Sequence, residues 1–415
     1  MLAIGFMLVW SGGSRADSRE ETARSIPNFD ALHDIGEELV DIDSPLRGLF
    51  ELPDSLENPL HAQRATLEEK LGLRFALVYT ALYQNATAGK NKESAGIGRL
   101  EVFGTFDVLG KWFGDPGRNT GVLGFALETT HRYADIPPAE LGSNIGSLWG
   151  TTDGYEKRNP NVRQLWWQQG LLDDALTLTL GKLDPNNFYD GHRLGNADRY
   201  FSNLAFSFSP ASAQPEEGLG VHLLIAPTDQ WYLSAGLHDA NGRRTKAGFE
   251  RFGKGEFFYG AELGFTPEIA GLGLGNYRIH GWYKDEASVL GIEKSYGFSL
   301  GFDQEVWVGE DVLLIPFLRW GYQGRNAVNT RQFVSFGTGV AGFLESRDDI
   351  AGLAFGWGEP SQRPRRDQYV TELFYRIQIS RSLRLTPSYQ LIFQPSLSPG
   401  RDVLGVLGLR ARLSF

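Results

Sequence analysis

The sequence predicts an all-β protein, a sixteen-stranded antiparallel transmembrane β-barrel that follows a short helical or irregular N-terminal extension. Three observations lead to this fold class. The chain of 415 residues contains 51 Gly and 13% aromatic residues. Its mean hydropathy is -0.26, and after residue 10 no stretch approaches the roughly 18 apolar residues that a spanning helix needs. From Leu71 onward, apolar and polar residues alternate with a period of two, as in strands with one apolar face.

The composition excludes several classes of protein. The chain has no Cys, which rules out a disulfide-stapled scaffold and a Cys-ligated metal site. Its net charge of -10 argues against a nucleic-acid partner, because binding to phosphates needs a basic face. A soluble all-β protein and a membrane β-barrel both remain, since the polar lumen of a barrel keeps the mean hydropathy low.

The first residues differ from the rest of the chain. Residues 1–16 contain an apolar run followed by small residues, which predicts a signal peptide and export from the cytoplasm. Residues 17–70 form an extension that lies in the periplasm or associates with the barrel lumen; a solvated linker fits the same residues. Within it, Asn28 is expected to start one helix and Asn58 a second one, with a loop between them.

The predicted barrel occupies residues 71–415. Seventeen segments alternate, but single-chain bacterial barrels have an even number of strands. If the last strand runs towards the periplasm, the short turns between strands should all lie on the periplasmic side. They do so only when residues 203–210 do not form a membrane-spanning strand. The expected strands are therefore 73–84, 97–109, 120–132, 162–170, 174–183, 219–227, 230–239, 256–266, 275–285, 295–308, 311–323, 332–344, 349–358, 368–380, 383–394 and 403–415. This leaves a long external loop over 184–218, which we expect to fold into the pore mouth as a constriction.

The last segment ends on an aromatic residue. Counting back from Phe415, apolar residues occupy one face and polar residues, including Arg410 and Arg412, the other. This resembles the closing strand of bacterial outer-membrane barrels, whose C-terminal Phe is an assembly signal. The resemblance implies a location in the outer membrane of a Gram-negative-type bacterium, contact with its lipid, and recognition by the barrel-assembly machinery through the Phe415 strand.

Two longer motifs resemble one family. The segment RQLWWQQGLLDDALTLTLGKLDPNNF, residues 163–188, and LTPSYQLIFQPS, residues 385–396, are similar to paired strands of the OprB-type carbohydrate-selective porins, as are HDANG at 238–242 and the final GLRARLSF. The resemblance covers residues 71–415. Residues 17–70 match nothing in that family. The resemblance implies a sixteen-stranded outer-membrane porin that passes sugars by passive diffusion.

The side chains on the inward parity are the candidate pore lining. A sugar presents hydroxyl groups and an apolar C–H face, so a selective passage needs fixed donors and acceptors together with aromatic rings. The predicted lining is Arg74, Arg99, Glu101, Glu128, Trp166, Arg278, Trp282, Arg319, Glu372, Arg376, Arg384 and Arg410. The loop residues expected at the constriction are Asn187, Tyr189, His192, Arg193 and Arg199. The same charges also fit a girdle of ion pairs that stabilises the wall.

Other functions fit the sequence less well. None of the seven His belongs to an HExxH or another metal-binding spacing, and no G-x-S-x-G elbow occurs. We therefore expect no catalytic residues, no metal and no cofactor. The alternatives are an anion or general diffusion porin, an outer-membrane hydrolase using His192 or His238, and a soluble sugar-binding β protein. Both a monomer and a homotrimer are compatible with these features.

Overall fold

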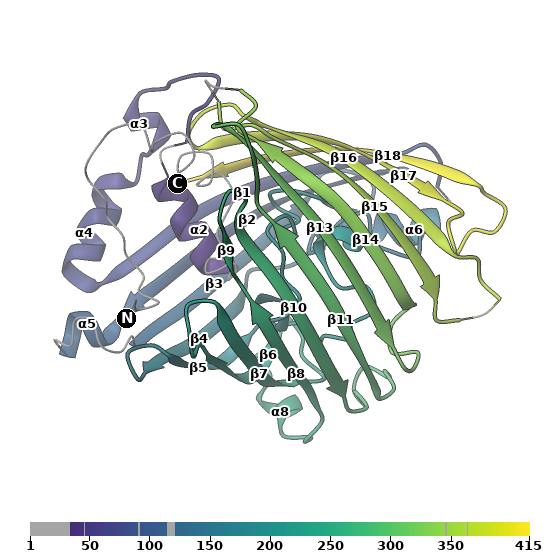
Figure 1. Ribbon diagram of the computed structural model, residues 1–415, viewed down its shortest axis with the longest axis horizontal. Coiled ribbons are helices and arrows are strands. Elements are labelled where there is room, and N and C mark those ends of the chain that lie inside the picture. The colour runs from purple at the N-terminus through teal and green to yellow at the C-terminus, as the bar shows by residue number, and fades with distance from the viewer. Residues whose placement is uncertain (1–33, 45, 90–91, 114–120, 345–346, 363) are drawn as a thin grey trace.

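The computed structural model describes residues 34–415 except 45, 90–91, 114–120, 345–346 and 363 (Figure 1). The signal peptide predicted over residues 1–16 and the helix start predicted at Asn28 lie outside the described residues. The part of the extension that is described begins with a helix, and the first strand of the barrel begins at Leu73.

Antiparallel strands close into a barrel, as predicted. β1 (Leu73–Ala86) pairs with β2 (Ser94–Asp107) on one side and with β18 (Val403–Ser414) on the other, so the sheet has no free edge. The other long strands are β3 (Gly121–Arg132), β4 (Asn161–Leu171), β5 (Leu176–Leu183), β6 (Gly218–Ile225), β7 (Trp231–Asp239), β8 (Phe257–Phe265), β10 (Gly273–Lys284), β11 (Ser295–Gln304), β13 (Val312–Gln323), β14 (Thr330–Ala341), β15 (Ile350–Pro360), β16 (Gln368–Gln378) and β17 (Leu383–Phe393). Sixteen long strands therefore lie within the described residues, and the sixteen-stranded prediction is confirmed.

Residues 203–210 do not cross the barrel, which confirms the exclusion of this segment. Leu204–Ser207 form the short helix α7 instead, with the side chain of Asn203 accepting a hydrogen bond from the Ala205 N–H. The exclusion restores an even strand count and leaves one long connection, residues 184–217, between β5 and β6. We call this connection the inner loop.

Most strand ends lie within a few residues of the prediction, and two short strands were not predicted. The single strand expected over 295–308 is interrupted after Gln304, and Val306–Val308 form a separate short strand, β12. Glu305 lies at the break, where its backbone N–H donates to the Leu274 carbonyl and its carboxylate accepts from the Leu274 N–H. A second short strand, β9 (Glu268–Ile269), pairs with the start of β10.

The helices lie at the ends of the strands and inside the barrel. They are α2 (Asp34–Asp43), α3 (Asp54–Glu57), α4 (His61–Leu71), α5 (Val108–Phe113), α6 (Pro138–Ile145) and α8 (Phe249–Phe252). The helix expected to start at Asn58 begins at His61, because Asn58 instead closes α3 by donating its N–H to Asp54. In Figure 1, α2 to α5 gather at the barrel end that also holds the C-terminus. Among the described residues, no helix is both long enough and apolar enough to cross a bilayer.

The two faces of the wall have opposite chemistry. On β18, Leu407 and Leu409 are 60% and 45% exposed, whereas Arg410 and Arg412 on the alternate face are 2% exposed. The apolar face therefore points outward, and the charged face points into the barrel. This is the alternation expected of a barrel embedded in lipid.

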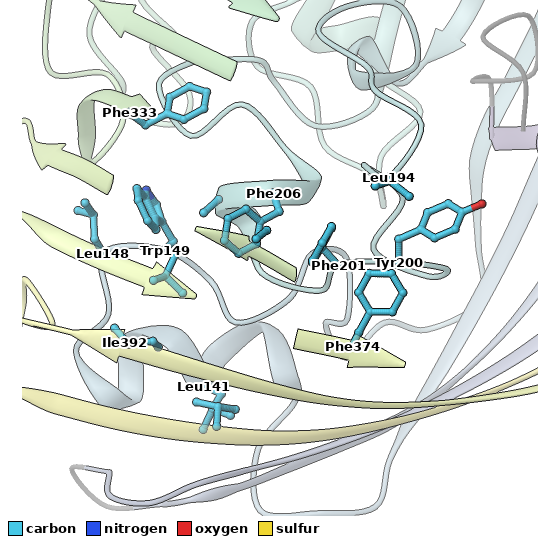
Figure 2. Close-up of a cluster of buried hydrophobic side chains, with 14 of the residues drawn as sticks. Leu141, Leu148, Trp149, Leu194, Tyr200, Phe201, Phe206, Phe333, Phe374 and Ile392 are labelled. Atoms are coloured by element: carbon cyan, nitrogen blue, oxygen red, sulfur yellow. The ribbon is translucent and has the colours of Figure 1, made fainter. Parts of the chain in front are cut away.

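Two connections fold inward and fill one half of the barrel. Residues 133–160, which contain α6, and the inner loop pack against the inner faces of β13–β18. Figure 2 shows Trp149, Phe201 and Phe206 from these connections grouped with Phe374 of β16. The rings of Phe201 and Phe374 meet edge to face with centroids 4.8 Å apart. Charged side chains of the inner face lie on both halves of the wall, and those on β13–β18 include Arg319, Glu372 and Arg410.

Candidate pore lining

One anchor of the inner loop is Glu372 on β16. Its two carboxylate oxygens accept hydrogen bonds from the backbone N–H groups of Ser202 and Asn203, at 2.8 and 2.9 Å. From β18, Arg410 donates to the Tyr200 carbonyl over 2.8 Å and to the Ser202 hydroxyl over 3.0 Å. Both residues face inward, as predicted from their parity, and both form hydrogen bonds with the inner loop.

A second anchor is formed around Asp190 of the inner loop. Its carboxylate lies 2.9 Å from Arg319 of β13 and 3.6 Å from Arg278 of β10. Burial opposes ionisation of Asp190, but these guanidinium groups outweigh it and lower its pKa to about 2. The Asp190 N–H donates to Glu262 of β8 over 2.6 Å. The predicted lining residues Arg278 and Arg319 therefore hold the loop in place.

The other residues predicted at the constriction also lie inside the barrel. Tyr189 stacks on His280 with ring centroids 4.9 Å apart, and the His192 Nε2 lies 2.6 Å from the Phe206 carbonyl. Arg193 is 3.8 Å from Asp303. Asn187 donates to Gln164 over 3.3 Å, and Arg199 pairs with Glu38 over 3.1 Å. The loop therefore contacts the wall through Asn187, Tyr189 and Arg193, and α2 through Arg199.

A network of alternating charges covers the inner face near β2 to β6. We call it the charged wall, and it consists of Arg99, Glu101, Glu128, Arg163, Glu217 and Arg244. Arg99 and Arg163 lie 2.9 and 2.8 Å from opposite oxygens of Glu101. Arg163 and Arg244 share Glu217 in the same way, at 3.4 and 2.7 Å. Arg244 also reaches Glu128 over 3.4 Å, so each carboxylate fixes the orientation of a guanidinium group.

Acidic residues of the inner loop interact with the guanidinium groups of the charged wall. Burial opposes ionisation of Glu217, which ends the loop, but Arg244 and Arg163 outweigh it and lower its pKa to about 2. Burial and the negative charge of Glu217 raise the pKa of Asp184, at the loop's start, to about 7. Arg99 also pairs with Asp198 and lies over the Tyr155 ring, 4.5 Å from its centroid.

The remaining predicted residues occupy separate places. Trp166 and Trp282 face inward but are only 4% and 5% exposed; Trp166 covers Gly124, and Trp282 stacks on Phe258. Arg376 lies over the Tyr200 ring at 5.3 Å, and Arg384 donates to Gln378 over 3.1 Å. Arg74, whose side chain is 23% exposed, pairs with Asp43 over 2.8 Å. The structure therefore groups Arg99, Glu101 and Glu128 in one network, Arg278 and Arg319 around Asp190, and Glu372 and Arg410 around Ser202.

The described residues contain no group of three or more His, Asp or Glu that could hold a metal ion. The contacts described above on the inner face are hydrogen bonds, charge pairs and aromatic contacts. This chemistry suits weak, reversible contact with a polar solute.

The family comparison decides which protein class this is. The model of the carbohydrate-selective porin, OprB family, matches residues 122–415, well over half of the chain. The chain belongs to this family. It is an outer-membrane porin, a channel protein rather than an enzyme.

Individual relatives are distant in sequence but similar in extent. Porin AaxA of Chlamydia pneumoniae is 23% identical over 371 residues, which cover 87% of this chain and 82% of that protein. Porin AaxA of Chlamydia felis is 23% identical over 317 residues, covering 74% of this chain and 69% of that protein. The high-pH structure of Pseudomonas putida OprB superposes with a TM-score of 0.71 at 16% identity, covering 89% of this chain and 99% of that chain. The structural likeness supports the OprB-type barrel fold.

Sequence reasoning missed Arg163 of this OprB-family porin. Strict alternation along β4 places Gln164 and Trp166 inward and Arg163 outward, yet Arg163 and Gln164 are both buried. The pairing of β4 with β3 shifts register between Ala126 and Leu127, so that β4 has one residue more than its partner. Such a bulge turns two successive side chains to the same face. Glu217 and Arg244 lie in connections, where parity gives no signal.

Proposed function

We propose that this porin allows small carbohydrates to diffuse passively through the barrel, along the charged wall. The supporting observation is that guanidinium donors and carboxylate acceptors alternate there and hold one another in fixed positions. A sugar hydroxyl both donates and accepts a hydrogen bond, so it can exchange partners with either kind of group. The charged wall therefore offers both donors and acceptors to a polar solute.

The balance of charges favours a neutral solute. Three guanidinium groups of the charged wall, those of Arg99, Arg163 and Arg244, are matched by the three carboxylates of Glu101, Glu128 and Glu217. A passage that selects anions would present an excess of positive charge. The balance therefore supports the carbohydrate proposal over an anion porin.

The proposal divides the predicted lining into two roles. Arg99, Glu101 and Glu128 belong to the charged wall and are the groups proposed to contact solute. Arg278, Arg319, Glu372 and Arg410 are the groups proposed to hold the inner loop, which narrows the passage. Selectivity then depends on the width that the loop leaves and on the hydrogen-bonding pattern of the wall.

Single-channel recording in planar bilayers tests the proposal. Adding a mono- or disaccharide is expected to lower the ion current, and Arg99→Ala and Arg376→Ala are expected to weaken this block. Arg331→Ala is the matched control, because Arg331 is exposed near the start of β14. If sugars leave the current unchanged while small anions reduce it, the carbohydrate proposal is wrong and the channel is an anion porin.

A further inference from the structure

We propose that helix α2 is a plug that narrows the sugar passage at the end of the barrel that holds the C-terminus, and that Glu38 keeps it in place. The inference rests on the proposed passage along the charged wall. It names a narrowed state and the ion pairs whose rupture widens the passage.

The apolar face of α2 packs on the inner surface of the barrel. Ile35 and Leu39 are 0% and 1% exposed. They belong to one buried cluster with inward-facing side chains of β1 to β4, which are Ala76, Val78, Phe103, Ala126 and Trp166. A helix of ten residues that buries this face against the inside of the wall occupies space a solute would otherwise cross.

The position of α2 complements that of the inward-folded connections. The inner loop and residues 133–160 pack in a buried cluster whose wall residues come largely from β13–β18, whereas α2 contacts β1, β2 and β3. The two packing sites therefore lie on different parts of the inner wall. In Figure 1, α2 lies next to the C-terminus, at one end of the barrel strands.

Glu38 is the polar connection between the plug and its surroundings. Its carboxylate pairs with Arg412 of β18 through one oxygen and lies 3.1 Å from Arg199 of the inner loop through the other. Arg412 is itself fixed by donating to the Thr80 hydroxyl over 2.9 Å. Since Glu38 is 3% exposed, removing its charge leaves two buried guanidinium groups without this partner, which is costly. The carboxylate of Glu38 thus connects α2 to both β18 and the inner loop.

The segment after α2, residues 46–58, straps the plug to the barrel rim. Arg47 pairs with Asp348 over 3.0 Å, and the Leu49 N–H donates to the Gln378 carbonyl over 2.8 Å. A Cβ atom at Gly48 would come within 2.5 Å of the Ser380 backbone, so this close approach requires glycine. Glu57 accepts hydrogen bonds from Ser380 and Ser382 in the turn between β16 and β17. The strap keeps α2 at the mouth even when the Glu38 pairs are broken.

Charge reversal at Glu38 tests the plug by conductance in salt alone. Glu38→Arg places a third cation beside Arg199 and Arg412, and it is expected to raise the single-channel conductance at least about twofold by driving α2 out of the passage. Adding Arg412→Glu to that variant recreates an opposite-charge pair and is expected to lower the conductance again. Glu51→Arg is the matched control, because Glu51 is exposed on the strap. Unchanged conductance in folded Glu38→Arg would overturn the proposal.

A labelling measurement keeps the test independent of whether the charge reversal folds. The chain has no native Cys, so single Cys variants report on one position each. In the otherwise unchanged porin, Leu39→Cys is expected to resist a water-soluble maleimide, whereas Val40→Cys, at a position that is 44% exposed, is expected to react rapidly. Equal, rapid labelling of both would show that the apolar face of α2 does not pack on the inner surface of the barrel, and it would overturn the proposal. Neither measurement uses a sugar, so a failure of sugar block leaves the plug proposal standing.

Discussion

Arg319 of β13 and Asp190 of the inner loop form a buried ion pair, with 2.9 Å between Nη2 and Oδ2. The two side chains are 1% and 2% exposed. The pair joins the barrel wall to a loop residue that is more than a hundred positions away in sequence. The pair therefore joins β13 to the inner loop at a fully buried position.

Asp190→Asn is expected to loosen the inner loop. The substitution keeps the shape of the side chain but leaves Arg319 and Arg278 without their shared anion, which costs about 3 kcal/mol or more for a buried pair. Limited proteolysis of the porin in vesicles should then cut within residues 184–217. Asp229→Asn, in an exposed turn, is the control, and a loop that stays equally resistant in both variants contradicts this role of the pair.

Phe374→Ala is expected to destabilise the barrel by about 3–5 kcal/mol, because it opens a cavity under Phe201. Urea unfolding in lipid vesicles measures the change. Leu373→Ala, on the outward face of the same strand and 55% exposed, leaves no internal cavity and should cost less. Equal losses would mean that the packing around Phe201 contributes little to stability.

The stability of the inner loop is expected to depend on pH with two opposite slopes. Burial opposes ionisation of Asp190 and Glu217, but neighbouring guanidinium groups lower the pKa of each to about 2. A lowered native pKa stabilises the fold above the unfolded pKa of about 4, and this contribution is lost as the pH falls from about 4 to about 2. Burial and Glu217 raise the pKa of Asp184 to about 7, so its contribution instead declines as the pH rises from about 4 to about 7.

Stability measured against pH separates these contributions. Asp190→Asn should flatten the loss of stability on the acid side, and Asp184→Asn should flatten the decline toward neutral pH. If both variants keep the wild-type slopes, the ion pairs around the loop do not set its pH dependence.

Arg163→Ala is expected to shift the ion selectivity of the channel toward cations. Arg163 pairs with both Glu101 and Glu217, so its loss leaves the charged wall with an excess of negative charge. The reversal potential in a salt gradient measures this change. Arg331→Ala, which removes an exposed cation outside the charged wall, should leave the potential unchanged. A shift of equal size in both variants would show that the charged wall does not face the permeating ions.

The regular parts of this molecule could be predicted from its sequence. Alternation marks every long strand, and the parity of the tight links identifies residues 203–210 as a segment that does not span. Local signals were also sufficient for α4, although its start is displaced because Asn58 closes the preceding helix.

The contacts inside the barrel could not be predicted in the same way. A bulge in β4 turns Arg163 inward against the parity rule, and Glu38, Glu217 and Arg244 come from segments without a period. Their partners are determined by how the connections fold back into the barrel. Parity could place Arg278, Arg319, Glu372 and Arg410 on the inner face, but only the folded loop shows which groups they bind.

The most direct test of a carbohydrate passage along the charged wall is the swelling rate of vesicles that contain the purified porin. In an isotonic solution of an uncharged disaccharide, wild-type vesicles are expected to swell faster than vesicles with Arg99→Ala, while Arg331→Ala matches the wild type. Vesicles that do not swell in the disaccharide but swell in isotonic solutions of small anions would contradict the account.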